Sequence, residues 1–170
     1  MLGRFTKARI DQLENEVGAG TVVVNCAAGG WTSHDGARRA QVIARLAPDV
    51  VVLSFGTNDC APERLVGLDS FAVHLHAIIE AFPLATVVAF LPPSVAEQDG
   101  VGPRGRTNAV LSSYRHALRE AVSAGRALDT DATLGALVAM GAPVHVDGLH
   151  LTDEAYGLVI PALAKLIKAA

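Results

Sequence analysis

Hydrophobic residues in this chain follow two patterns that alternate along the sequence. In the first pattern they form short continuous runs rich in valine, at Thr21–Asn25, Val50–Phe55 and Thr86–Leu91, with a weaker run at Ala127–Thr130. Continuous apolar runs of this length are typical of strands that are buried on both faces of a parallel sheet. The runs therefore predict four strands of one parallel sheet.

In the second pattern, hydrophobic residues recur every three or four positions, which is the spacing of one face of an α-helix. Phe71, Leu75, Ile78 and Phe82 form one such stripe, and a second stripe runs from Leu111 to Val122. The sequence predicts further helices at Met1–Val17, Gly36–Leu46 and Thr152–Lys168. Thr152 is the predicted N-cap of the last of these.

Strands that alternate with helices predict a three-layer α/β/α domain around a parallel sheet. A length of 170 residues suits one domain over 1–170. Hydrophobic residues make up 51% and charged residues 18%, which indicates a well-buried core and excludes a disordered chain. The net charge of −3, without a block of like charges, does not favour nucleic acid as a partner. The apolar runs are too short to span a bilayer.

Two features bear on the cellular compartment. Cys26 and Cys60 are too few for a disulfide framework and have no Cys-x-x-Cys spacing, so we expect both to be reduced. The first residues are charged and helical in pattern, unlike a signal peptide. The sequence as given therefore predicts a cytoplasmic protein, an expectation that a further amino-terminal segment would change.

Polar segments follow the first two predicted strands, at the sheet edge where doubly wound folds place their chemistry. After the first strand, Gly29 and Gly30 allow a sharp turn that exposes backbone N–H groups to a ligand. No Lys-Ser/Thr follows, which excludes a phosphate loop. After the second strand, Asn58 in Gly56-Thr57-Asn58-Asp59 would donate its side-chain N–H to an oxyanion. Each segment alone is equally consistent with an ordinary turn.

A third segment precedes the last predicted helix. Asp147 stands three residues before His150, across Gly148. This spacing places a carboxylate against one imidazole nitrogen, which fixes the tautomer and leaves the other nitrogen to act as a base. An Asp-x-x-His pair is weak evidence alone, and most of its weight comes from its place just before a capped terminal helix.

Together, in this order and spacing, the three segments resemble conserved blocks of the SGNH (GDSL) hydrolase family, over nearly the whole chain from Thr21 onward. The resemblance implies a flavodoxin-like SGNH fold and ester hydrolysis without a cofactor or metal. It implies that Gly30 and Asn58 stabilise the oxyanion, that His150 is the general base and that Asp147 is its partner. Asp59 would support the turn.

The family's first block, a Gly-Asp-Ser that carries the nucleophile, does not occur in this sequence. By the family's spacing, the serine would fall near or before Met1, so we expect a shortened form whose first strand is missing. That strand normally lies between the second and third strands of the family. Its absence would leave a gap of about 10 Å unless the neighbouring strands close up. Exposed sheet edges would then favour self-association.

Four residues are weighed as substitute nucleophiles, each with a structural alternative. Ser33 would instead cap a helix, Ser54 would be a core hydroxyl and Cys60 a small buried apolar side chain. Ser94 follows Pro92–Pro93 in the loop after the third strand.

Several other residues are weighed for a role at the site. Trp31 would line a substrate pocket or pack in the core. His145 lies close to His150 but lacks its preceding aspartate. Arg104 and Arg106 lie in a Gly- and Pro-rich loop that is interpreted as solvated, with a position at the border of the crevice as the alternative. The remaining histidines are interpreted as solvated, and they are His34, His74, His76 and His116.

The sequence thus predicts an ester hydrolase that acts on a small acyl ester by a Ser-His-Asp mechanism, with activity of these 170 residues impaired because the serine is absent. The alternative is a non-catalytic binding or interaction module on the same fold. A third interpretation is a hydrolase that uses Ser33 or Cys60.

Overall fold

Helices and strands alternate along most of the chain, as the hydrophobic pattern predicts. A computed structural model describes residues 6–170. In chain order its elements are α1 (Lys7–Val17), α2 (Ser33–Ile43), the 3-10 turn η1 (Ala44–Leu46), β1 (Val50–Leu53), α3 (Leu68–Glu80), β2 (Thr86–Phe90), the 3-10 turn η2 (Pro103–Gly105), α4 (Asn108–Ala121), β3 (Ala127–Leu128), α5 (Thr130–Ala139) and α6 (Asp153–Lys168). The start of the predicted helix Met1–Val17 lies outside the described residues.

Three parallel strands form the sheet in the order β1-β2-β3, which confirms the predicted α/β fold. Residues 50–53 of β1 pair in register with 86–89 of β2, and β2 pairs with β3 through Ala89 and Phe90. β2 is the central strand and is buried over 87–90. Within residues 6–170, no strand pairs with the outer edge of β1.

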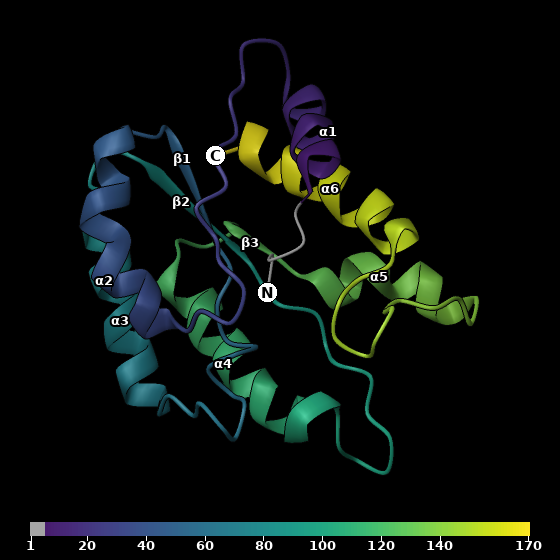
Figure 1. The fold of residues 1–170 in the computed structure, drawn as a ribbon. Coiled ribbons are helices and arrows are strands. Elements are labelled where there is room, and N and C mark those ends of the chain that lie inside the picture. Colours follow the sequence, from purple (N-terminus) through teal and green to yellow (C-terminus); the bar gives the residue numbers. More distant parts are fainter. Residues whose placement is uncertain (1–5) are drawn as a thin grey trace.

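Helices cover both faces of the sheet and give the molecule three layers (Figure 1). On one face, Phe71 of α3 and Leu111 of α4 pack in a core with Ala89. On the other face, Ile160 of α6 packs in a second core with Phe90. Neighbouring residues of β2 thus serve opposite cores, because successive side chains of a strand alternate between its faces. None of the helices within 6–170 combines the length and hydrophobicity that a membrane span requires.

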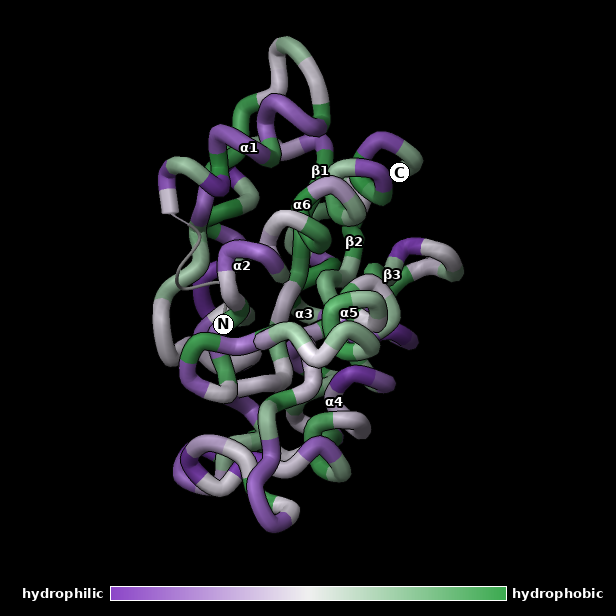
Figure 2. Tube along the Cα trace, turned by 90° about the vertical axis from the view of Figure 1, so that its right-hand side faces the viewer, coloured by the Kyte–Doolittle hydropathy of each residue, from purple (hydrophilic) through white to green (hydrophobic). Residues whose placement is uncertain are grey.

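Hydrophobic residues are concentrated in the inner elements, and an outer helix is more hydrophilic. The strands and α6 are largely hydrophobic, whereas α1 is largely hydrophilic (Figure 2). Leu13 is the buried residue of α1 and lies in the core shared with α6. α1 therefore lies on α6 as an outer helix, where Arg9 bonds to Asp153 at 2.5 Å and stacks on the ring of Tyr156.

The first predicted strand, Thr21–Asn25, is wrong, because this segment has no strand structure. Val22 is 78% exposed and Val24 60% exposed, so one side of the segment faces solvent. Val23 packs against the core of α1 and α6, and its N–H donates to Glu14 Oε1 at 2.7 Å. A strand needs a hydrogen-bonded neighbour. The segment does not pair with β1, so it does not close the gap that was expected beside that strand.

The end of the sheet also differs from the sequence prediction. The strand predicted at Ala127–Thr130 is shorter, because Asp129 accepts a hydrogen bond from Ala132 N and caps α5. α5 is absent from the prediction because its own apolar residues are spread around all sides of the helix and form no amphipathic stripe.

Candidate active site

The predicted base and its partner lie on a tight loop between α5 and α6. The loop folds back on itself, with Val146 N donating to His150 O at 2.8 Å and Thr152 N to Val144 O at 3.0 Å. Gly148 turns the chain at a φ of 78°, in the left-handed region that favours glycine. Thr152 caps α6 by accepting a hydrogen bond from Ala155 N, as predicted. The loop therefore holds Asp147 and His150 at its tip.

Within this tip the two side chains are in direct contact. Asp147 Oδ2 lies 2.6 Å from His150 Nδ1, while Oδ1 accepts hydrogen bonds from the N–H groups of Leu149 and His150. Desolvation raises the pKa of Asp147, but these hydrogen bonds outweigh it and hold that pKa at about 2. Asp147 is therefore ionised at neutral pH, which favours the His150 tautomer with a proton on Nδ1 and the basic nitrogen at Nε2.

The Gly56–Asp59 turn follows β1 and is tied to the glycine turn by one buried carboxylate. Asp59 is fully buried; its Oδ1 accepts from Ser33 N at 2.7 Å and its Oδ2 from Gly56 N at 3.0 Å. Gly56 has a φ of 120°, which an L side chain rarely adopts. Asp59 thus supports the turn, in the role that the resemblance implies.

Asn58 and Gly30, the predicted oxyanion donors, are brought together by this arrangement. Asn58 Nδ2 donates to Trp31 O at 2.8 Å, directly after Gly30. Gly30 has a φ of 83°, and its carbonyl accepts a hydrogen bond from Arg64 at 2.6 Å. An amide –NH₂ has two hydrogens, so the contact with Trp31 leaves Asn58 one further donor.

Arg106 was interpreted as solvated, and that interpretation is wrong. Its side chain is 1% exposed and donates from Nε to Thr57 O at 2.7 Å, from Nη1 to Pro103 O at 3.1 Å and from Nη2 to Asn58 Oδ1 at 3.3 Å. Burial lowers the pKa of Arg106. Arg106 therefore fixes the orientation of the Asn58 amide. The Gly- and Pro-rich sequence around it gave no signal of this role, whereas Arg104 is exposed as expected.

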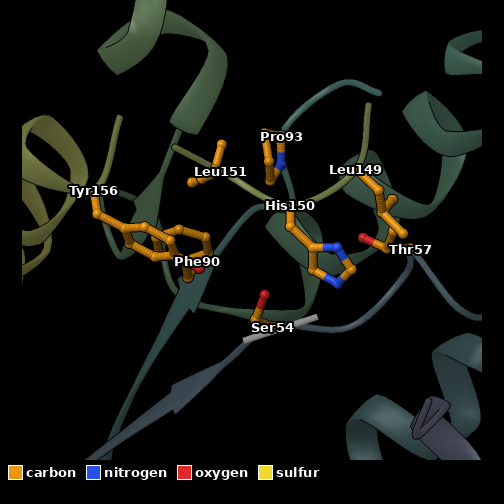
Figure 3. A pocket seen from close by; sticks show the side chains of 8 residues that line it. All are labelled: Ser54, Thr57, Phe90, Pro93, Leu149, His150, Leu151 and Tyr156. Carbon is orange, nitrogen blue, oxygen red and sulfur yellow. The ribbon is translucent and has the colours of Figure 1, made fainter. Parts of the chain in front are cut away.

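A small cavity lies beside His150 (Figure 3). Its volume of about 20 Å³ is enough for one water molecule or a methyl group. Its lining is mostly apolar with three hydroxyls, and consists of Ser54, Thr57, Phe90, Pro93, Leu149, His150, Leu151 and Tyr156. Gly30 and Asn58 are not among the lining residues.

Of the four substitute nucleophiles, Ser54 is the one that lines this cavity with His150. It is half-buried just after β1 rather than inside the strand. Ser33 is fully buried with its Oγ 3.0 Å from His74 Nδ1, and Ser94 Oγ donates to Asp131. Cys60 is buried, donates to Thr57 O, and has its pKa raised mainly by desolvation. Ser33, Ser94 and Cys60 do not line the cavity that contains His150.

The other weighed residues do not line the cavity. Trp31 does not line it and instead carries the guanidinium of Arg39 over its ring at 4.3 Å. His74 is half-buried against Ser33 and not solvated as expected, whereas His76 is exposed. Within the described residues, no three His, Cys, Asp or Glu side chains are grouped so as to hold a metal ion.

Comparison with protein families gives a match over almost the whole chain. The model of the GDSL-like lipase/acylhydrolase family matches residues 3–158. The chain belongs to this family. Ester hydrolysis is the activity that the family level supports, and no curated protein sequence matches the chain.

Solved structures share the fold of this GDSL-like protein. A lipase/acylhydrolase from Enterococcus faecalis is 21% identical with a TM-score of 0.82, over 96% of this chain and 86% of that chain. The aryl esterase of M. smegmatis is 19% identical (TM-score 0.71; 95% and 84%). An acetylxylan esterase from Geobacillus stearothermophilus is 20% identical (TM-score 0.71; 94% and 77%). These likenesses show the SGNH hydrolase fold.

Proposed function

We propose that this GDSL-like chain provides the proton-transfer and oxyanion-binding parts of an active site that hydrolyses small acyl esters. The observation that carries the proposal is the 2.6 Å contact between Asp147 Oδ2 and His150 Nδ1, with His150 lining a cavity. An ionised Asp147 orients the imidazole and stabilises it when it is protonated, as the acid of a catalytic triad does.

In the proposed reaction, a serine hydroxyl attacks the ester carbonyl while its proton passes to His150 Nε2. The negative charge develops on the carbonyl oxygen, where Asn58 Nδ2 and the Gly30 N–H donate hydrogen bonds. His150 then gives its proton to the leaving alcohol. Water attacks the acyl-enzyme with its proton again passing to His150, and the acid leaves as the serine regains its proton.

The lining of the cavity bears on the acyl group. Phe90, Leu151 and Tyr156 supply apolar surface beside His150, against which the carbon atoms of a small acyl group would pack. We therefore propose esters of small acyl groups as the preferred substrates.

The nucleophile in the proposed mechanism is a serine on a strand alongside the open edge of β1, as in the Gly-Asp-Ser block of the family. This serine is absent from the 170 residues, and His150 and Asn58 alone would leave only weak hydrolysis. Ser54 is the second candidate because it shares the cavity with His150 (Figure 3).

Hydrolysis of p-nitrophenyl acetate separates these possibilities. We expect low activity of the 170-residue chain and high activity of a form extended at its amino terminus by a strand ending in Gly-Asp-Ser. His150→Ala should abolish the activity of the extended form. If Ser54 is the nucleophile, the unextended chain is active and Ser54→Ala inactivates it, while Ser112→Ala, at an exposed serine of α4, does not. Inactivity of both forms would favour the alternative of a binding module.

A further inference from the structure

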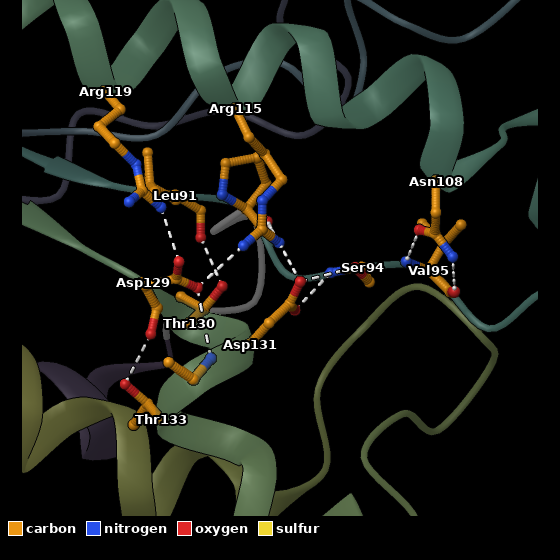
Figure 4. A network of polar contacts seen from close by, with 12 residues as sticks. Leu91, Ser94, Val95, Asn108, Arg115, Arg119, Asp129, Thr130, Asp131 and Thr133 are labelled. Atoms are coloured by element: carbon orange, nitrogen blue, oxygen red, sulfur yellow. Dashed lines mark hydrogen bonds and ion pairs between the residues drawn. The ribbon is translucent and has the colours of Figure 1, made fainter.

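The segment that follows β2, residues 91–96, is held by side chains from α4 and α5 at four of its six residues. Thr130 Oγ1 donates to Leu91 O at 2.7 Å, and Arg115 Nη1 donates to Pro92 O at 2.8 Å. Asn108 holds both polar groups of the Val95 backbone, at 2.8 and 2.9 Å. The 91–96 segment is therefore fixed to the helices on one side (Figure 4).

Asp131, in the first turn of α5, makes the central contact of this set. Its Oδ1 accepts from Ser94 N at 2.8 Å and its Oδ2 accepts from Ser94 Oγ at 2.6 Å. Arg115 forms an ion pair with Asp131 and a second one with Asp129, which also pairs with Arg119 at 2.6 Å. Two arginines thus balance two aspartates, and Arg115 is only 12% exposed, so solvent screens these contacts less than it screens surface pairs.

On its other side, the 91–96 segment contacts the loop that carries the proposed base. Ala96 N donates to the carbonyl of Gly148, between Asp147 and His150, at 2.9 Å. Gly148 fits closely there, since a Cβ added to it would lie 3.0 Å from Pro103 Cγ and 3.6 Å from Ala96 Cβ. A shift of the segment would therefore be passed to the tip of the loop.

His145, at the base of the same loop, lies next to these groups. Burial, the largest effect, lowers its pKa; the Ser94 backbone, Asp131 and Asp147 raise it, and His150 lowers it. Each of these effects requires proximity. The carboxylate that holds Ser94 and the proposed base are thus in one neighbourhood.

We propose that Asp131 is a positioning residue for the Asp147–His150 pair, acting through Ser94 and the Ala96–Gly148 hydrogen bond. The proposal rests on the proposed function in one respect, namely that this pair moves the proton. Asp131 bonds to Ser94 and Arg115 rather than to either member of the pair, and it sets the position of the backbone that holds their loop. A misplacement of about 1 Å at a catalytic group can cost about 100-fold in rate.

Asp131→Asn tests the proposal, with Asp129→Asn as the matched control. Asp131→Asn removes a carboxylate from the first turn of α5, and Asp129→Asn removes the carboxylate of its N-cap. Both substitutions weaken a contact with Arg115. Asn at 129 keeps an oxygen for the α5 cap, and Asp129 bonds to Arg115, Arg119 and the first turn of α5 rather than to the 91–96 segment. Any loss of stability common to both variants is thereby separated from an effect on the loop.

The readout is NMR of the pair itself, which needs no ester turnover. We expect Asp131→Asn to raise the titration midpoint of the Asp147 carboxyl from about 2 toward its ordinary value of 3.8, and to weaken the downfield signal of the His150 Nδ1 proton. Asp129→Asn should leave both unchanged. Unchanged signals in Asp131→Asn, or equal changes in the two variants, would overturn the proposal.

Two additions keep the test decisive. If Asp131→Asn does not fold, Ser94→Ala removes one of the two Ser94 contacts, and an unchanged Asp147 midpoint in that variant overturns the proposal.

In an active form of the enzyme, Asp131→Asn should lower kcat about 10-fold or more with KM unchanged. An inactive extended form would refute the proposed function, while the NMR result would still decide the role of Asp131.

Discussion

Replacing Arg106 with methionine tests whether a buried guanidinium organises the proposed oxyanion site. Methionine fills a similar volume without any hydrogen-bond donor. The substitution would remove the guanidinium from three acceptors. Thr57 O would keep its contact with Cys60 Sγ and Pro103 O its contact with the backbone N–H of residue 106, whereas Asn58 Oδ1 would lose its donor.

The structure lets the cost be estimated contact by contact. An unsatisfied buried acceptor costs about 1–3 kcal/mol. The acceptors on Thr57 and Asn58 are in buried contacts, whereas Pro103 O is in a partly buried one and can be hydrated. Relief of the buried charge of Arg106 offsets part of this loss. We therefore expect the free energy of unfolding to fall by about 2 kcal/mol, mainly because the Asn58 amide oxygen loses its donor.

Urea unfolding followed by circular dichroism at pH 7 measures this loss, provided that the m-value is unchanged. Arg104→Met is the control, because Arg104 is exposed in the same loop and should change stability by no more than about 0.5 kcal/mol. A loss below about 1 kcal/mol for Arg106→Met, or equal losses for the two variants, would refute the reasoning.

Three further predictions concern other parts of the molecule. The pKa of Asp147 is about 2 in the fold, below its ordinary 3.8. The contribution of this carboxylate to the free energy of unfolding is therefore present above pH 4 and is lost as the pH falls toward 2. Because the side chain is 46% exposed, the free energy of unfolding of the wild type should exceed that of Asp147→Asn by only about 1 kcal/mol at pH 6. Urea unfolding measures this difference, which should shrink as the pH falls. Gly36→Ala would place a Cβ 2.5 Å from Phe55 Cζ and should lower Tm, whereas Gly157→Ala in α6 meets nothing and should raise it; a loss at both sites would contradict this account. The open edge of β1 predicts a concentration-dependent rise in mass by sedimentation, and a constant monomer mass up to high concentration would exclude it.

Sequence reasoning succeeded where the cause is local. The Asp147–His150 pair was found because three residues of chain suffice to bring the two side chains together. The stripes of α3 and α4 predicted their buried faces, since each stripe is a property of its own helix.

Sequence reasoning failed where a distant partner decides the structure. The valines of Thr21–Asn25 have high strand propensity, but strand formation depends on a neighbour. Arg106 looks like any surface arginine until Thr57 and Asn58, almost 50 residues away, surround it. The cavity that joins Ser54 to His150 likewise depends on packing between segments far apart in the chain.

The position of β2 between two other strands has a consequence for how the fold opens. Amides of a central strand exchange with solvent only when the sheet separates, whereas outward-facing amides at an unpaired edge exchange through small local openings. Hydrogen–deuterium exchange should therefore be slowest in 87–90 and faster in β1, although both strands are rich in valine. The Gly56–Asp59 turn follows the faster strand. The proposed oxyanion donors would accordingly lie on the part of the sheet that opens first, while the base loop rests on the segment that leaves the most protected strand.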